Sequence, residues 1–131
     1  MGIFSGLFGN KNVGEIDDKS SVPWKTLEFM EQLQEIEMNS KERTQVVFKH
    51  STTCGISRMV LNRFNSGYNL ENGLMDFYFL DLHANRDISN AIAKKFDVVH
   101  QSPQLLILKN GDVVAHGSHG GINEINLGEY L

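Results

Sequence analysis

The spacing of hydrophobic residues changes along this 131-residue chain, and the changes separate predicted helices from predicted strands. Between Pro23 and Glu37, apolar residues recur every three or four positions, which predicts an amphipathic helix that starts at the proline. The same spacing predicts a second helix directly after Cys54 and a third that starts at Asp87. The apolar face expected for the second helix consists of Ile56, Met59, Val60 and Phe64.

Short apolar runs between these helices predict β-strands. The predicted strands are Val46–Phe48, Phe77–Leu82, Gln104–Leu108 and Val113–Ala115. The run from Phe77 is apolar on both faces, which is typical of the interior of a parallel sheet. Asn110-Gly111 predicts a tight hairpin between the last two strands, and a final helix is expected after Gly121. The order α-β-α-β-α-β-β-α indicates an α/β protein with a central mixed sheet of about four strands flanked by helices.

The chain length suits one domain, preceded by an N-terminal arm. Residues 1–22 combine glycines and polar residues with an apolar group at their start, so we expect an arm that docks loosely or is mobile. The apolar group consists of Ile3, Phe4, Leu7 and Phe8. The domain itself is predicted to span residues 23–131.

Charge and hydropathy exclude several classes of partner. Twelve basic residues against 16 acidic ones give a formal charge of −4, and the longest basic run is Lys94-Lys95. Nucleic acid and anionic membranes are therefore poor candidates. No apolar stretch approaches the ~20 residues that a bilayer crossing needs. The start of the chain lacks the pattern of a secretory signal, so we expect a cytoplasmic protein.

Cys54 is the only cysteine, which excludes an internal disulfide and any four-cysteine metal site. It follows three small polar residues, Ser51-Thr52-Thr53, and opens the second predicted helix. Unpaired backbone N–H groups and the positive end of the helix dipole at that position favour a thiolate. The alternative is a small, buried and unreactive cysteine, which is the more common role of a lone cysteine.

The segment Phe48–Ser57, FKHSTTCGIS, resembles the thioredoxin superfamily and, within it, the monothiol bacilliredoxins of the bacillithiol system (YtxJ type). The resemblance covers about Trp24 to Leu131 and implies a thioredoxin-like fold. It also implies a monothiol thiol–disulfide oxidoreductase that removes bacillithiol from mixed disulfides of client proteins through Cys54. Bacillithiol is then the expected co-substrate, and bacillithiolated clients are the expected partners. Ser57 holds the place of the second thiol of thioredoxin.

Gly55 departs from the family, which usually has proline after its cysteine. Cys54-Gly55-Ile56-Ser57 is therefore also similar to the C-G-F-S motif of monothiol glutaredoxins, which carry iron–sulfur clusters with glutathione. A thioredoxin-like binding module, or an iron–sulfur carrier without disulfide turnover, is thus the alternative function.

The resemblance adds two further elements to the expected substrate site. Ser102-Pro103 matches the cis-proline that thioredoxin-like folds place beside the active cysteine. Gly120-Gly121 is similar to the glycine pair with which glutaredoxins hold a carboxylate of glutathione, and backbone N–H groups there would suit the malate of bacillithiol. An ordinary turn is the alternative for the glycine pair. The expected substrate-binding residues are Thr53, Gly55, Ser57, Ser102, Pro103, Gly120 and Gly121.

The histidines give weaker signals. His50 precedes Cys54 by four residues and could lend a positive charge, but we expect it mainly to face solvent from a strand. His116 and His119 have H-x-x-H spacing in a glycine-rich loop, without the regular helix that such metal motifs use. We therefore expect no metal site.

Overall fold

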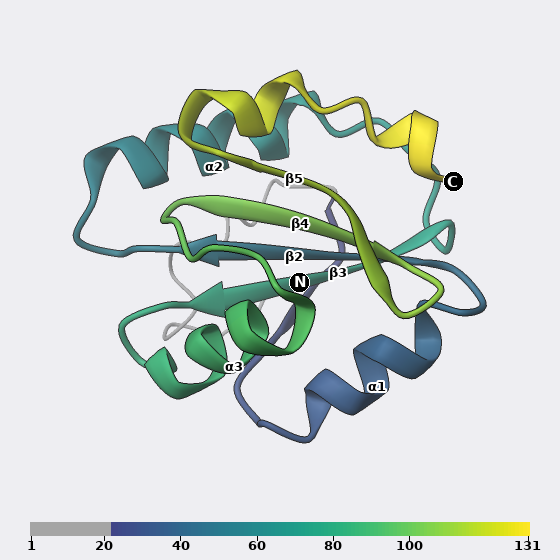
Figure 1. The fold of residues 1–131 in the computed structure, drawn as a ribbon. Coiled ribbons are helices and arrows are strands. Elements are labelled where there is room, and N and C mark those ends of the chain that lie inside the picture. The colour runs from purple at the N-terminus through teal and green to yellow at the C-terminus, as the bar shows by residue number, and fades with distance from the viewer. Residues whose placement is uncertain (1–21) are drawn as a thin grey trace, which may run out of the picture.

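The computed structural model describes residues 22–131, so the predicted N-terminal arm lies outside the described residues except for Val22, which is buried. A central sheet carries helices on both faces (Figure 1). The elements are β1 (Trp24–Thr26), α1 (Gln32–Asn39), β2 (Thr44–His50), α2 (Gly55–Gly67), β3 (Met75–Asp81), α3 (Arg86–Phe96), β4 (Gln104–Lys109), β5 (Asp112–Ser118), and the 3₁₀ helices η2 (His119–Glu124) and η3 (Leu127–Tyr130). No helix among residues 22–131 is long and apolar enough to cross a membrane.

The sheet has the order β1-β3-β2-β4-β5. β3 pairs in parallel with both β1 and β2, whereas β4 runs antiparallel to β2 and β5 antiparallel to β4. The predicted α/β class with a mixed sheet is confirmed, but residues 22–131 form a sheet of five strands rather than about four. Because β2 and β3 are parallel neighbours, their carboxyl ends lie at the same edge of the sheet, where α2 begins.

Two hydrophobic clusters hold the helices on the sheet. Val46 and Phe48 of β2 belong to the cluster that packs beneath α2 and η2. Val47, from the same strand, belongs to the cluster beneath α1 and α3. This alternation follows from strand geometry, in which successive side chains point to opposite faces. The same alternation determines on which face of the sheet the last residues of β2, before Cys54, place their side chains.

The helix predicted from Pro23 to Glu37 is wrong in its first half. Trp24–Thr26 instead forms an edge strand paired with β3, and the Trp24 indole nitrogen donates to Asn65 Oδ1 at 3.0 Å. The side chain of Gln32 then shapes the turn, because its Oε1 accepts from two backbone N–H groups and its Nε2 donates to the Thr26 carbonyl. Strand pairing therefore overrides the helical periodicity, and α1 begins only at Gln32.

The predicted apolar face of α2 is also partly wrong. Ile56 is 51% exposed and Met59 is 63% exposed. The buried residues of the helix are Ser57, Val60, Leu61, Phe64 and Asn65. The helix is rotated so that Ser57 enters the interior, where its hydroxyl meets polar groups of β2. Ile56 and Met59 consequently lie on the surface within the first turns after Cys54.

The hairpin after β4 is confirmed, since Asn110 and Gly111 both have positive φ angles, 54° and 86°. This geometry is that of the type I′ turn, which favours Asn-Gly. The final helix is not an α-helix as expected, because the segment forms the two short 3₁₀ helices η2 and η3.

Candidate functional site

Cys54 lies at the junction of β2 and α2, as predicted. It has an extended backbone, is the N-cap residue of α2, and is half-buried. Its backbone N–H donates to the Ser51 carbonyl at 3.3 Å, and its own carbonyl accepts from the N–H of Arg58 at 3.2 Å. The thiol therefore precedes the first turn of a 13-residue helix, at the end where backbone N–H groups and the helix dipole stabilise a negative charge.

His50 is fully buried, so the expectation that it faces solvent is wrong. Strand alternation places it on the α2 face together with Phe48. Its Nδ1 lies 2.8 Å from the hydroxyl oxygen of Ser57, and that oxygen also accepts the backbone N–H of Ser51 at 3.1 Å. Ser57 therefore joins the end of β2 to the first turn of α2. Its hydroxyl supports the cysteine loop from the interior of the protein. From the sequence, Ser57 was identified only as the residue at the position of the second thiol of thioredoxin.

The sequence did not connect His83 with the cysteine. His83 Nε2 lies 2.8 Å from Ser51 Oγ and 3.1 Å from Thr53 Oγ1. The backbone N–H of His83 donates to Asp81 at 3.1 Å, which anchors the histidine to the end of β3. The predicted strand order could have indicated this contact, because polar residues that follow neighbouring parallel strands meet at one edge of the sheet.

The peptide bond between Ser102 and Pro103 is cis, as predicted. Gln104, the next residue, opens β4 and pairs with Lys49 of β2. The cis bond thus lies at the edge of the sheet from which the Cys54 loop departs. The hydroxyl oxygen of Ser102 is buried and has no hydrogen-bond partner among the described residues.

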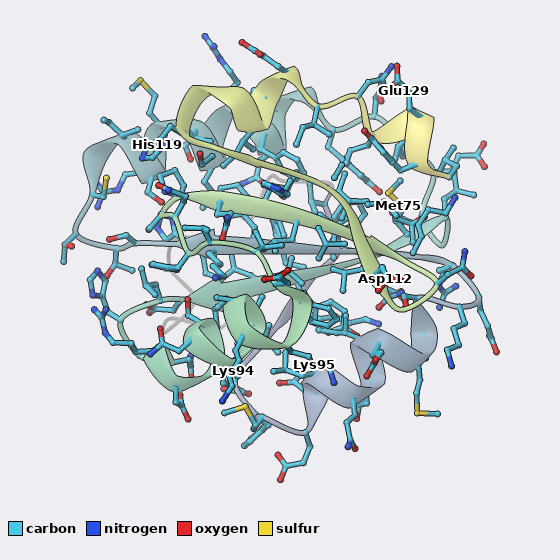
Figure 2. The ribbon with its side chains drawn as sticks, in the orientation of Figure 1. Met75, Lys94, Lys95, Asp112, His119 and Glu129 are labelled. Atoms are coloured by element: carbon cyan, nitrogen blue, oxygen red, sulfur yellow. The ribbon has the colours of Figure 1, made fainter. Side chains whose placement is uncertain are left out.

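Gly120 and Gly121 lie in η2, beside the cis-proline. His119, which opens η2, has a φ of 55° and donates its N–H to the Pro103 carbonyl at 3.2 Å. Figure 2 shows His119 at the same end of the molecule as the start of α2. A Cβ added at Gly120 or Gly121 would meet no atom within 4 Å, whereas one at Gly117 would lie 3.1 Å from Ile125. Close packing therefore requires glycine at Gly117 rather than at the predicted pair.

A buried polar cluster lies on the other face of the sheet, toward α3. Lys49 is fully buried, and its Nζ lies 3.2 Å from the Ser89 carbonyl oxygen and 3.3 Å from His100 Nδ1. Burial lowers the pKa of Lys49 to about 8. Burial, followed by the positive charges of Lys49 and Arg86, lowers the pKa of His100. Burial of Lys49 could not be predicted from the sequence, because lysine is rarely found in a core.

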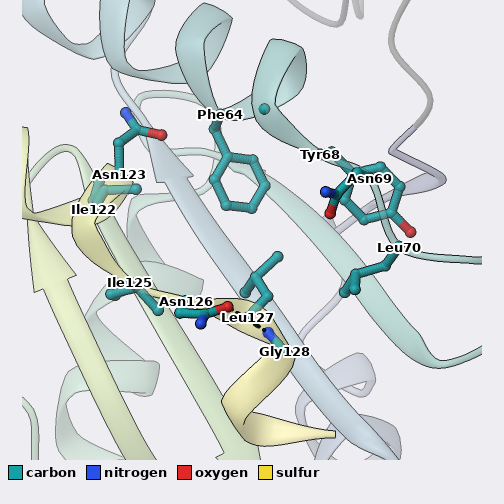
Figure 3. A pocket seen from close by; sticks show the side chains of 11 residues that line it. Phe64, Tyr68, Asn69, Leu70, Ile122, Asn123, Ile125, Asn126, Leu127 and Gly128 are labelled. Carbon is teal, nitrogen blue, oxygen red and sulfur yellow. Dashed lines mark hydrogen bonds between the residues drawn. The ribbon is translucent and has the colours of Figure 1, made fainter.

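A cavity of about 300 Å³ lies at the opposite end of α2 (Figure 3). Phe64, Tyr68 and residues of η2 and η3 line it. Its α2 residues Phe64 and Gly67 lie 10 and 13 residues after Cys54, about 15 and 20 Å along the helix, so this wall of the cavity is distant from the cysteine. Within residues 22–131, no group of three or more His, Cys, Asp or Glu side chains is arranged to hold a metal ion.

Comparison with known proteins agrees with this geometry. Residues 25–127 match the family described as monothiol bacilliredoxin BrxC. A solved structure described as a putative oxidoreductase with a thioredoxin fold is 38% identical, with coverage of 82% of this chain and 92% of that chain and a TM-score of 0.67. Thioredoxins of Malassezia sympodialis (15% identity, 88% and 95% coverage, TM-score 0.66) and Fasciola hepatica (20%, 82% and 99%, 0.61) share the fold. The thioredoxin-like fold predicted from the sequence is therefore confirmed.

Proposed function

Because the chain belongs to the monothiol bacilliredoxin family, whose members are redox thiol proteins of thioredoxin fold, we propose that it removes bacillithiol from protein mixed disulfides. The observation that carries this proposal is the position of Cys54, half-buried at the N-cap of α2 at the edge of the sheet where the cis-proline lies. It is the chain's only cysteine, so the chemistry proceeds without a second thiol from the same chain.

The proposed reaction is a balanced disulfide exchange. The Cys54 thiolate attacks the bacillithiol sulfur of a client mixed disulfide, a bond forms between Cys54 Sγ and that sulfur, and the client leaves as a thiolate. A second low-molecular-weight thiol then attacks the Cys54–bacillithiol disulfide, releases Cys54 as a thiolate and carries away bacillithiol in a mixed disulfide. The N-terminus of α2 favours both steps, because it stabilises Cys54 as attacking and as leaving thiolate.

We assign substrate contacts to the surface around Cys54. Thr53 and Gly55 flank the cysteine and are both exposed. Ser102-Pro103 would lie against the mixed disulfide, and backbone N–H groups near Gly120-Gly121 would bind a malate carboxylate of bacillithiol. Ser57 acts indirectly in this assignment, because its hydroxyl is buried against His50 and Ser51. We place the reaction in the cytoplasm, where low-molecular-weight thiols are kept reduced.

The test uses the full chain and a single-cysteine client protein carrying bacillithiol. Mass spectrometry over time should show loss of bacillithiol from the client together with its appearance on Cys54. Cys54→Ser is the matched control and should leave the client modified. The same client carrying glutathione tests selectivity for the small thiol and should react more slowly. Persistence of the client adduct with the wild-type chain would refute the proposal, and a visible iron–sulfur absorption band in freshly purified protein would favour the carrier alternative instead.

A further inference from the structure

Lys49 is a buried cation with no acidic partner among residues 22–131. Its Nζ contacts the Ser89 carbonyl and the His100 imidazole, neither of which carries a negative charge. A second cation, Arg86, also acts on this cluster, since its charge and that of Lys49, after burial, lower the pKa of His100. Burial of an ammonium group costs free energy unless hydrogen bonds compensate. An apolar residue could fill this core position without that cost. The chain instead has a lysine there, and its amino group makes two specific contacts.

These contacts hold the segment Asp97–Pro103, which we call the proline strap because it connects α3 to the cis-proline before β4. His100 in the strap meets Lys49 Nζ and also lies 3.3 Å from Ser89 Oγ. Gln104, the cross-strand partner of Lys49, donates its side-chain amide to the Val99 carbonyl at 2.9 Å. Polar side chains of β2, α3 and β4 thus contact the strap. The strap ends in the cis peptide bond before Pro103, which lies at the edge of the sheet where the Cys54 loop begins.

Lys49 and His50 are adjacent in β2 and point to opposite faces of the sheet. On the α2 face, His50 contacts Ser57 and so supports the loop that carries Cys54. On the α3 face, Lys49 contacts His100 and so supports the strap that carries Pro103. Two consecutive residues of β2 therefore support different parts of the site: His50 supports the Cys54 loop and Lys49 supports the proline strap. The position of the loop relative to the strap depends on β2.

We propose that Lys49 is a positioning residue for disulfide exchange, which acts through His100 to hold Ser102-Pro103 beside Cys54. This inference rests on the proposed function and adds the residue that aligns the proline side of that site. Lys49 does not contact the reacting sulfurs in this role. Its effect should therefore fall on reactions that need a docked disulfide, and much less on reactions of the Cys54 thiolate alone.

Lys49→Met tests the inference, because methionine retains the length and apolar stem of lysine but not its hydrogen-bond donors. Lys94→Met is the matched control, since Lys94 is exposed on α3 (Figure 2). Exchange with the bacillithiolated client should slow about tenfold in Lys49→Met, as expected for loss of one charge-assisted hydrogen bond, with no change in the control. Alkylation of Cys54 by iodoacetamide should stay within about twofold of wild type, since it needs no docked partner.

The pH profile gives a readout that a purely structural role would not change. In the wild type, the ratio of exchange rate to alkylation rate should fall as the pH rises through about 8, where Lys49 loses its proton and one hydrogen-bond donor. The ratio should not change with pH in Lys49→Met. An equal loss of alkylation and exchange, or no loss of either, would overturn the inference.

Amide hydrogen exchange separates this inference from the proposed function. The His119 N–H donates to the Pro103 carbonyl and reports directly on the proline strap. Its protection should fall in Lys49→Met and in His100→Ala, which removes the strap contact but retains the buried lysine, and should be unchanged in Lys94→Met. If the wild type fails to react with the client, the proposed function fails while this measurement still tests the strap. Unchanged protection in His100→Ala would refute the role of Lys49 even if Lys49→Met does not fold.

Discussion

Ser57→Ala is the most direct test of how the cysteine loop is held. The hydroxyl of Ser57 is fully buried, accepts the Ser51 N–H at 3.1 Å and lies 2.8 Å from His50 Nδ1. Alanine fits the space and favours a helix, so the substitution removes the two polar contacts with little steric change. It leaves a backbone N–H and an imidazole nitrogen that have lost a partner in the interior.

The expected loss of stability follows from these two contacts. Each buried group left without its partner costs about 1–3 kcal/mol, and partial relaxation brings the sum to about 2–4 kcal/mol. With a loss of about 2 kcal/mol of stability per molar urea, the middle of the usual range, the unfolding midpoint should fall by about 1–2 M. The loop itself should also loosen, so exchange at Cys54 should slow beyond what the loss of folded protein explains.

Urea denaturation followed by tryptophan fluorescence is a suitable assay, because Trp24 packs against the Phe64 ring of α2 at a centroid distance of 5.8 Å. Ser66→Ala is the control, since Ser66 is an exposed serine of the same helix. Its midpoint should be unchanged or slightly higher. Equal midpoints for the two variants would show that the Ser57 contacts contribute nothing to stability and would refute the reasoning.

Two further predictions concern the stability of the fold. Burial raises the pKa of Asp76, but hydrogen bonds from Gln45 and Arg43 outweigh it and lower the pKa below its ordinary value of 3.8. Wild-type stability should therefore be lost as the pH falls below about 4, whereas Asp76→Asn should be less stable at pH 7 and lose less on acidification, as followed by urea midpoints at each pH. Gly117→Ala should lower the thermal midpoint because its Cβ would lie 3.1 Å from a side chain, whereas Gly120→Ala should leave it unchanged.

The sequence predicts those features that depend on local chemistry. Asn110-Gly111 specifies its hairpin because both residues tolerate the positive φ angles that the turn requires. The apolar run of β3 predicts a strand inside a parallel sheet, and β3 indeed lies between two parallel neighbours. The three polar residues before Cys54 predict the start of a helix, which places the cysteine at an N-cap. Such signals need only a few neighbouring residues.

The features that the sequence did not predict depend on contacts between distant segments. Trp24 lies in a helical pattern but is recruited to the edge of the sheet by β3, 53 residues later in the chain. His50 was expected to face solvent, but it is buried against Ser57, seven residues later, on the buried face of α2. The sequence indicates no role for His83 or His100 at the site. Their positions beside the cysteine loop and the proline strap follow from strand order, which local periodicity does not encode.

The strand order also explains how groups from several strands come together around a single cysteine. Parallel pairing of β2 and β3 brings His83 to the Cys54 loop, and antiparallel pairing of β2 and β4 brings the cis-proline to the same edge. β2 is common to both pairings, and its last two residues, Lys49 and His50, have polar side chains that are buried on opposite faces of the sheet. A sheet with β2 at another position would separate these groups. The arrangement of the site is therefore a property of the topology, to which Cys54 contributes the reactive atom.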